Sequence, residues 1–222
     1  MSERVEGAEL HHGEEPMCNE SPQTTAPFSI RTFLRAQQAL LVHFNTPMST
    51  QHPTGFPNDL VDAKGLAGCR LSFSTIQTND RGPWQGGNPA DANAGGSIGL
   101  VVDVKDAGSV ISVDWTDSGS NLHGSLGHAP NAQNCADSIS KRTTANEWWI
   151  QDYIPLGIFA FLPAYAFVKQ NGKQGEVPIG FPSVLAAYPQ DPIYSVNMGS
   201  FVEFDRGTGR WLPTSYDRIV PR

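Results

Sequence analysis

Residues 98–115 have the sequence IGLVVDVKDAGSVISVDW, and this stretch predicts two β-strands joined by a tight turn. Valine and isoleucine, which favour strands, dominate both halves of it. The Asp-Ala-Gly sequence at 106–108 is typical of a hairpin turn. Asp103 and Asp114 alternate with valines, so we expect both carboxylates to project from the solvent face of this hairpin.

Short apolar runs of the same kind recur along the chain. Further strands are expected at 39–44, 71–76, 193–196 and 200–204. A strand that opens at 146–150 is expected to continue, after Pro155, into 158–167. The spacing of apolar residues and caps predicts short helices at 29–38, 58–66 and 135–144.

The composition agrees with a fold of this kind. Glycine (22 residues) and proline (17) are abundant, and only 17% of the 222 residues are charged, which favours strands and turns over a helical bundle. We predict one α+β domain over 27–222, made mostly of twisted antiparallel strands with short flanking helices. Residues 1–26 are rich in glutamate and carry few large apolar side chains, so we expect a disordered acidic tail there.

Charge and hydropathy exclude several classes of function. Most of the net charge of −7 comes from glutamates in the first 20 residues, so the body of the chain is nearly neutral and has no basic run for nucleic acid. The longest apolar segment, 154–168, is too short for a membrane span and contains Pro155, Gly157 and Pro163. The three cysteines form no CxxC pair and no signal peptide is visible, so we expect a cytoplasmic protein or one exported without a classical signal. The sequence has no GxSxG motif, which argues against a serine hydrolase.

Three segments, taken in chain order, form a set that suits a nucleotide substrate. His43 ends an apolar strand, Ser72 and Ser74 share one face of the next, and Glu147 opens a third. A histidine can hydrogen-bond a ribose hydroxyl, and paired hydroxyls can line a binding site and support a nearby carboxylate. A glutamate can bind another ribose hydroxyl and stabilise positive charge that develops on the sugar.

Each of these residues also has a purely structural interpretation. His43 follows an apolar run and fits a hydrogen-bonded histidine of the core. Ser72 and Ser74 fit the solvent face of an edge strand, and Glu147, which precedes two tryptophans, fits the rim of a sheet.

The motifs HFNT (43–46), LSFST (71–75) and NEWWI (146–150), the last followed by IPLGI (154–158), resemble those of the ADP-ribosyltransferase fold. That family has a strand bearing histidine or arginine, a strand with a Ser-Thr-Ser-like motif, and a glutamate-led strand that runs into an I-P-x-x-I motif. The likeness extends over 40–168, a little over half of the chain.

The resemblance implies an NAD-dependent ADP-ribosyltransferase of the kind found among toxins and effectors. NAD would be the substrate, nicotinamide would leave, and ADP-ribose would pass to a protein or small-molecule acceptor. Glu147 would be catalytic, and His43, Ser72 and Ser74 would bind NAD. A toxin of this kind would also have an inhibitory partner. Ala145 stands where enzymes that modify arginine carry glutamate or glutamine, so arginine is not implied as the acceptor.

A glycine-rich loop at 79–97 adds two candidates for NAD binding. Arg81 could clamp a phosphate, and Trp84 could stack on a base or on the nicotinamide ring. Alternatively, Trp84 packs back on the domain, since the loop has neither a GxGxxG nor a GxxxxGK pattern.

The main alternative function is a non-catalytic, β-rich binding module. In that hypothesis the histidine and glutamate belong to the scaffold. Tryptophans gathered at the surface would hold a ligand or partner, namely Trp84, Trp148, Trp149 and Trp211.

A metal site is not expected. His123, His128 and Cys135 match no common zinc-binding spacing and lie in or near a flexible, glycine-containing segment. They offer at most three ligands, whereas structural zinc sites have four.

Overall fold

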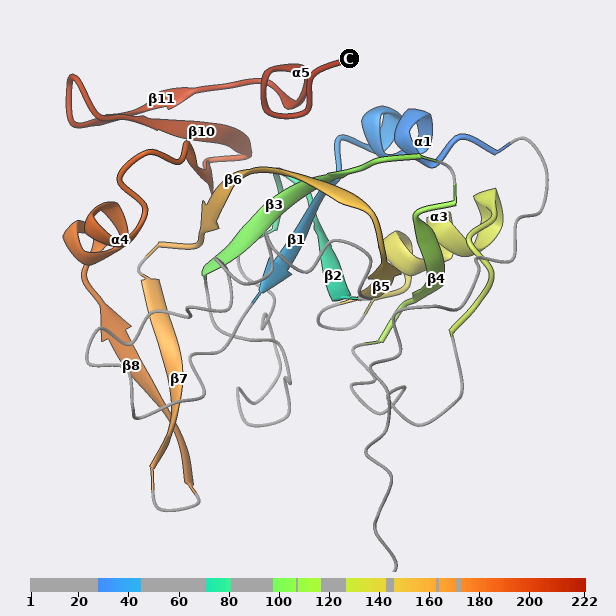
Figure 1. The fold of residues 1–222 in the computed structure, drawn as a ribbon, viewed down its shortest axis with the longest axis horizontal. Helices are drawn as coiled ribbons and strands as arrows, with labels where there is room; N and C mark the ends of the chain where they lie inside the picture. The colour runs from blue at the N-terminus through green and yellow to red at the C-terminus, as the bar shows by residue number, and fades with distance from the viewer. Residues whose placement is uncertain are drawn as a thin grey trace, which may run out of the picture.

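Figure 1 shows a computed structural model of the chain, in which short helices lie around a curved β-sheet. The structure describes residues 28–44, 71–80, 98–106, 108–116, 127–142, 146–162, 164–170 and 173–222. The predicted acidic tail at 1–26 and the predicted helix at 58–66 lie outside these residues.

The described residues form a nine-stranded sheet with the strand order β11-β10-β9-β6-β3-β1-β2-β5-β4 (Figure 1). Its strands are β1 (Leu40–Phe44), β2 (Leu71–Ile76), β3 (Ile98–Val104), β4 (Val110–Asp114), β5 (Glu147–Ile150), β6 (Tyr153–Ala160), β9 (Ile193–Asn197), β10 (Ser200–Asp205) and β11 (Arg210–Pro213). A separate two-stranded sheet pairs β7 (Ala164–Gln170) with β8 (Lys173–Ile179). Neighbouring strands are antiparallel except for β6 and β9, which are parallel.

Four short helices complete the described part of the chain, which confirms the predicted α+β class. They are α1 (Ile30–Gln37), α3 (Ala132–Ser140), α4 (Phe181–Ala187) and α5 (Tyr216–Ile219). The helix α1 begins at the N-cap Ser29, whose hydroxyl accepts a hydrogen bond from Thr32 N (3.3 Å) and so satisfies one backbone donor of the first turn. The helix predicted at 135–144 begins and ends earlier, as α3.

The two strands predicted within 98–115 are present, but they do not pair with each other, so the predicted hairpin is wrong. β3 pairs with β1 and β6, whereas β4 pairs with β5. The turn itself forms as expected, since Asp106 Oδ1 accepts a hydrogen bond from Gly108 N (2.9 Å). The chain therefore turns tightly between two strands that do not pair with each other.

The strand predicted to run from 146 to 167 is also divided. β5 ends at Ile150, and β6 starts after a turn in which Asp152 has a left-handed backbone (φ +54°), a conformation that aspartate tolerates. This turn lies beside the other one, since Lys105 N donates to Asp152 O (3.0 Å) and Gln151 N donates to Ser109 O (2.8 Å). The pairs β3–β6 and β4–β5 are thus two arms of one bent ribbon; in Figure 1 the first crosses the centre and the second is at the right.

Hydrophobic residues cover both faces of the sheet. Leu41 of β1 belongs to one buried cluster, while its neighbours Leu40 and Val42 belong to the other, as strand alternation requires. The helices α1 and α3 pack in the cluster of Leu41, and α5 packs in the cluster of Leu40. The end of the chain therefore closes the face opposite α1 and α3.

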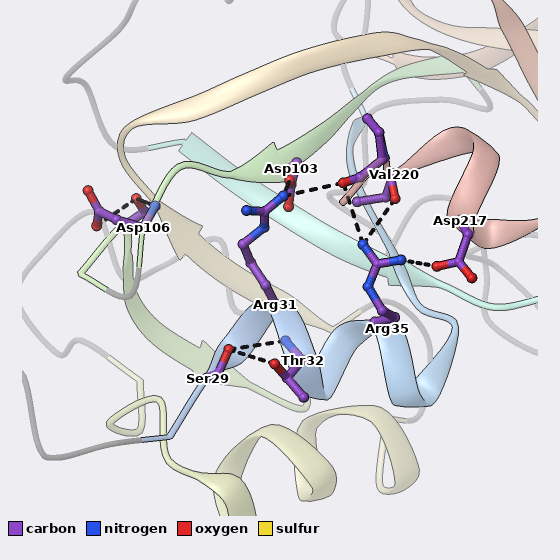
Figure 2. Close-up of polar contacts among 10 residues, drawn as sticks. Ser29, Arg31, Thr32, Arg35, Asp103, Asp106, Asp217 and Val220 are labelled. Carbon is purple, nitrogen blue, oxygen red and sulfur yellow. Dashed lines mark hydrogen bonds and ion pairs between the residues drawn. The ribbon is translucent and has the colours of Figure 1, made fainter.

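Two arginines of α1 hold the end of the chain (Figure 2). Arg31 donates to Asp103 Oδ2 of β3 (2.5 Å), and Arg35 pairs with Asp217 and donates to Val220 O (3.1 Å). The prediction that Asp103 lies on the solvent face is wrong: Asp103 is only 6% exposed. Its burial is tolerated because the guanidinium of Arg31 compensates for the lost hydration of the carboxylate.

We expect Arg31→Met to lower the free energy of unfolding by about 1–2 kcal/mol, because it leaves the buried Asp103 carboxylate without its cation. The loss is moderated by solvent, since the Arg31 side chain is 42% exposed. Arg210→Met, at an exposed position on β11, is the control and should change the stability by less than about 0.5 kcal/mol. Urea denaturation measures both variants, and equal losses would contradict a specific role for Arg31.

Candidate functional site

The three segments selected from the sequence lie on neighbouring strands. His43 is on β1, Ser72 and Ser74 are on β2, and Glu147 opens β5, and these strands are adjacent in the order β1-β2-β5. The segments are far apart in the sequence, so their proximity comes from the strand order and not from local structure.

The sheet opens between β1 and β2. These strands pair only where Leu40–Val42 faces Ser74–Ile76. Beyond that point β1 continues along β3, and β2 continues along β5 through Phe73, Ser72 and Leu71. The result is a fork with β1 on one side and the start of β2 on the other.

His43 bridges this fork. Its Nδ1 lies 2.6 Å from Ser72 O, so this nitrogen carries the proton if the contact is a hydrogen bond to the carbonyl. Its ring packs against Phe73, with 5.5 Å between the ring centroids. Phe73 points to the face that α1 and α3 cover, and the ring of His43 is therefore on that side of the fork.

Ser72, Ser74 and Glu147 lie on the opposite face. In the register of β2 and β5, Ser74 and Glu147 stand opposite each other, one step beyond the last pair, Phe73 with Trp148. Ser74 Oγ also donates to Asn146 O (2.9 Å). Glu147 is only 2% exposed, so it is not the residue at the rim of a sheet that its purely structural interpretation predicted. The structure thus places Ser74 and Glu147 on the same face of neighbouring strands and joins His43 to the Ser72 carbonyl, but it places the ring of His43 and Glu147 on different faces.

The buried side chain of Asn146 fixes the start of β5. Asn146 Oδ1 accepts from Thr75 N (2.8 Å), and Nδ2 donates to Thr75 Oγ1 (2.7 Å) and to Ser138 O (3.0 Å). Ser138 Oγ in turn accepts from Trp148 Nε1 (2.8 Å). These contacts tie β2, β5 and α3 together on the side of the sheet opposite the Glu147 side chain.

Arg142 supports the same region from beyond α3. Its guanidinium donates to Thr75 O (2.5 Å) and pairs with Asp80, and both charged side chains are mostly buried. Sequence analysis missed Asn146 and Arg142 as supporting residues. The position of Asn146 directly before Glu147 was the signal available, but its hydrogen bonds depend on strand pairing that the sequence did not reveal.

The remaining predicted residues divide into two groups. Arg81 and Trp84 lie outside the described residues. Trp148 is fully buried, Trp149 is half-buried, and Trp211 belongs to an aromatic group with Phe181 and Phe204. The tryptophans that the structure describes therefore do not gather at one place on the surface.

The residues considered for zinc are separated. His128 is exposed and its ring stacks on Trp115 with 4.3 Å between centroids, whereas Cys135 is fully buried on α3. His123 lies outside the described residues. Within the described part of the chain, no group of three or more histidine, cysteine or acidic residues could hold a metal ion.

Two open cavities lie elsewhere on the molecule. One, of about 530 Å³, is lined by residues of β10, β11 and the segment before β9. The other, of about 470 Å³, lies between residues that follow β2, residues that follow β6, and the turn from β9 to β10. Neither is lined by His43, Ser72, Ser74 or Glu147, so the candidate site is defined by its strands and not by either cavity.

Comparison with known proteins gives no family for this chain. No protein-family model matches the sequence, and no curated protein or solved structure matches it. Among the helices that the structure describes, none has the length and apolar character needed to cross a membrane. The function must therefore be inferred from the geometry of the strands.

We expect Asn146→Ala to lower the free energy of unfolding by about 2–3 kcal/mol, because it leaves buried donors and acceptors of Thr75 and Ser138 without this partner. Asn197→Ala is the matched control, since Asn197 is exposed at the end of β9, and it should cost less than about 0.5 kcal/mol. Chemical denaturation compares the two. A loss for Asn146→Ala no larger than the control would show that the network does not hold β5.

Burial raises the pKa of the Cys135 thiol to about 12, whereas an unfolded cysteine titrates near pH 8.5. Between these values the unfolded chain has lost a proton that the folded chain keeps, so the free energy of unfolding should fall as pH rises above about 9. The fall should be steeper in the wild type than in Cys135→Ala by up to about 1.4 kcal/mol per pH unit. Urea denaturation of both proteins from pH 8 to 11 measures this, and parallel curves would contradict it.

Proposed function

We propose that this protein is an NAD-dependent ADP-ribosyltransferase-like enzyme. One observation carries the proposal: the three segments that resemble that fold lie on adjacent strands, around the point where β1 and β2 separate. β1 and β2 follow each other along the chain, so their pairing is expected of most sheets, whereas β5 lies beside β2 although β3 and β4 separate them in the sequence.

Glu147 has the role of electrostatic catalyst in this proposal. Loss of nicotinamide from NAD breaks the bond between the ribose C1′ and the ring nitrogen, and positive charge develops on the sugar as the neutral base leaves. A carboxylate held in a buried position stabilises such charge more strongly than it would in water, because the surroundings have a lower dielectric constant. Glu147 is 2% exposed and held by a strand, which fits this role.

In this proposal the hydroxyls of Ser72 and Ser74 would bind the substrate on the face that carries Glu147. The imidazole of His43, whose ring is on the other face, would reach the substrate only through the fork between β1 and β2. The contact of Nδ1 with Ser72 O holds the ring of His43, so a ribose hydroxyl would have to bind through Nε2. The neutral hydroxyls and the carboxylate suit the ribose of NAD. Its phosphates require cationic groups, for which the sequence offered Arg81, outside the described residues.

The alternative, a non-catalytic binding module, depended on tryptophans at the surface. Trp148 is fully buried and its indole N–H donates to Ser138, so it belongs to the core. Three further parts of the proposal rest on the resemblance alone. They are that the protein is a toxin or effector, that the acceptor is a protein or small molecule, and that an inhibitory partner exists.

We expect the purified protein to release nicotinamide from NAD and Glu147→Gln to release it about 10²–10³ times more slowly, since the amide keeps the shape but loses the charge. Glu203→Gln is the matched control, because Glu203 is a half-buried glutamate on β10, and it should keep the wild-type rate. Free nicotinamide is followed by chromatography, and NAD binding by calorimetry.

Equal rates for the wild type and Glu147→Gln would contradict the role of Glu147. NAD binding without release would indicate a site of this kind that has lost its chemistry. Absence of binding would leave the non-catalytic module as the better account.

A further inference from the structure

Four polar side chains form a rectangle on β4 and β5. Asp114 pairs with Glu147, and Ser112 pairs with Trp149, so all four lie on the face that also carries Ser74. The two pairs are about 7 Å apart along the strands, and partners within a pair are about 5 Å apart between Cβ atoms. The Ser112–Trp149 pair therefore lies next to the carboxylate of the proposed catalytic residue.

Both groups of the Ser112–Trp149 pair lack a hydrogen bond. Ser112 is 1% exposed, and its Oγ and the Nε1 of Trp149 are buried without a hydrogen-bond partner among the described residues. The adjacent Trp148 shows the usual arrangement, since its Nε1 donates to Ser138 Oγ on the other face. A buried donor without a hydrogen-bond partner lowers stability, and a bound ligand that supplies the acceptor removes this cost.

The hydrogen-bonding groups of Ser112 and Trp149 favour a ligand that offers an uncharged oxygen atom. An indole N–H is only a donor, so its partner must have a lone pair. A guanidinium has donors but no acceptor and cannot satisfy it. An anion is disfavoured, because the carboxylates of Asp114 and Glu147 lie on the same face. A hydroxyl is the group that fits both requirements, since it accepts from the pair and can donate to a carboxylate.

We propose that Ser112 and Trp149 bind the acceptor substrate, and that this acceptor is a neutral polyhydroxyl compound such as a sugar or nucleoside. This inference rests on the proposed function. One hydroxyl of the acceptor accepts hydrogen bonds from Ser112 Oγ and Trp149 Nε1, and a neighbouring hydroxyl donates to the carboxylate pair of Asp114 and Glu147.

ADP-ribose is then transferred from NAD to the acceptor. The oxygen of the second hydroxyl forms a bond to the ribose C1′ of NAD while the bond from C1′ to the nicotinamide nitrogen breaks. The electron pair of that bond returns to the ring, and nicotinamide leaves as a neutral molecule. The hydroxyl proton passes to one carboxylate of the pair and then to water. Ser112 and Trp149 orient the acceptor and take no proton.

The test measures how the ADP-ribose released from NAD divides between water and an added acceptor. Three probes are compared, namely D-ribose, its carboxylate analogue ribonate, and the guanidinium compound agmatine, with products identified by mass spectrometry. The wild type should transfer ADP-ribose to ribose in preference to ribonate and agmatine. Ser112→Ala and Trp149→Phe should each lower the ratio of ribose adduct to free ADP-ribose about fivefold, while nicotinamide release stays within about twofold.

Ser195→Ala and Trp211→Phe are the matched controls. Ser195 is a buried serine on β9, and Trp211 is a partly buried tryptophan on β11, and neither change should alter the ratio. An unchanged ratio in Ser112→Ala and Trp149→Phe would overturn the inference, as would a preference for agmatine or ribonate.

A second measurement separates this inference from the proposed function. If the wild type releases no nicotinamide, the proposed function fails, and binding of ribose is then followed by ligand-observed NMR. Ribose signals that respond to the wild type and the controls but not to Ser112→Ala or Trp149→Phe would support the polyhydroxyl site without the transferase. Absence of ribose binding to the wild type, or equal binding to all variants, would overturn it.

Discussion

The position of Glu147 depends on the hydrogen bonds of its neighbour Asn146. That amide is almost wholly buried and joins the backbone and hydroxyl of Thr75 on β2 to Ser138 on α3. A buried amide with unsatisfied groups is costly, so the pairing that satisfies it is strongly favoured over a shifted register. A shift by one residue would also turn Glu147 to the opposite face of the sheet.

β1 and β2 pair with different arms of the bent ribbon. Its first arm, β3–β6, extends the sheet from β1, and its second arm, β4–β5, extends it from β2 (Figure 1). The arms meet where the turn at Asp152 contacts Lys105. β1 pairs with β2 only through Leu40–Val42 and Ser74–Ile76, and the rest of each strand pairs with its own arm.

The face of the sheet that carries Glu147 differs in polarity between the two arms. On β1, β3 and β6 it is mostly apolar and packs in the cluster that contains α5, and the buried Asp103 of β3 is paired with Arg31. On β2, β5 and β4 the same face carries serines, carboxylates and an indole, several of them buried. Burying polar groups in this way lowers stability unless they are paired. The arginines of α1 secure the apolar half by fixing the end of the chain (Figure 2).

The sequence by itself determined the α+β class, most strand positions and the residue types of the candidate site. Alternation of apolar and polar residues is a local signal, and it located β2 and the shared face of Ser72 and Ser74 correctly. It could not show which strands pair, and two of the wrong predictions, the hairpin within 98–115 and the continuous strand after Glu147, were errors of pairing. Only the tertiary structure decided that β5 lies beside β2, that Asp103 is buried under Arg31, and that Ser112 and Trp149 share a face with Glu147. The reason is physical: strand partners are selected by long-range packing and hydrogen bonding, which no short stretch of sequence contains.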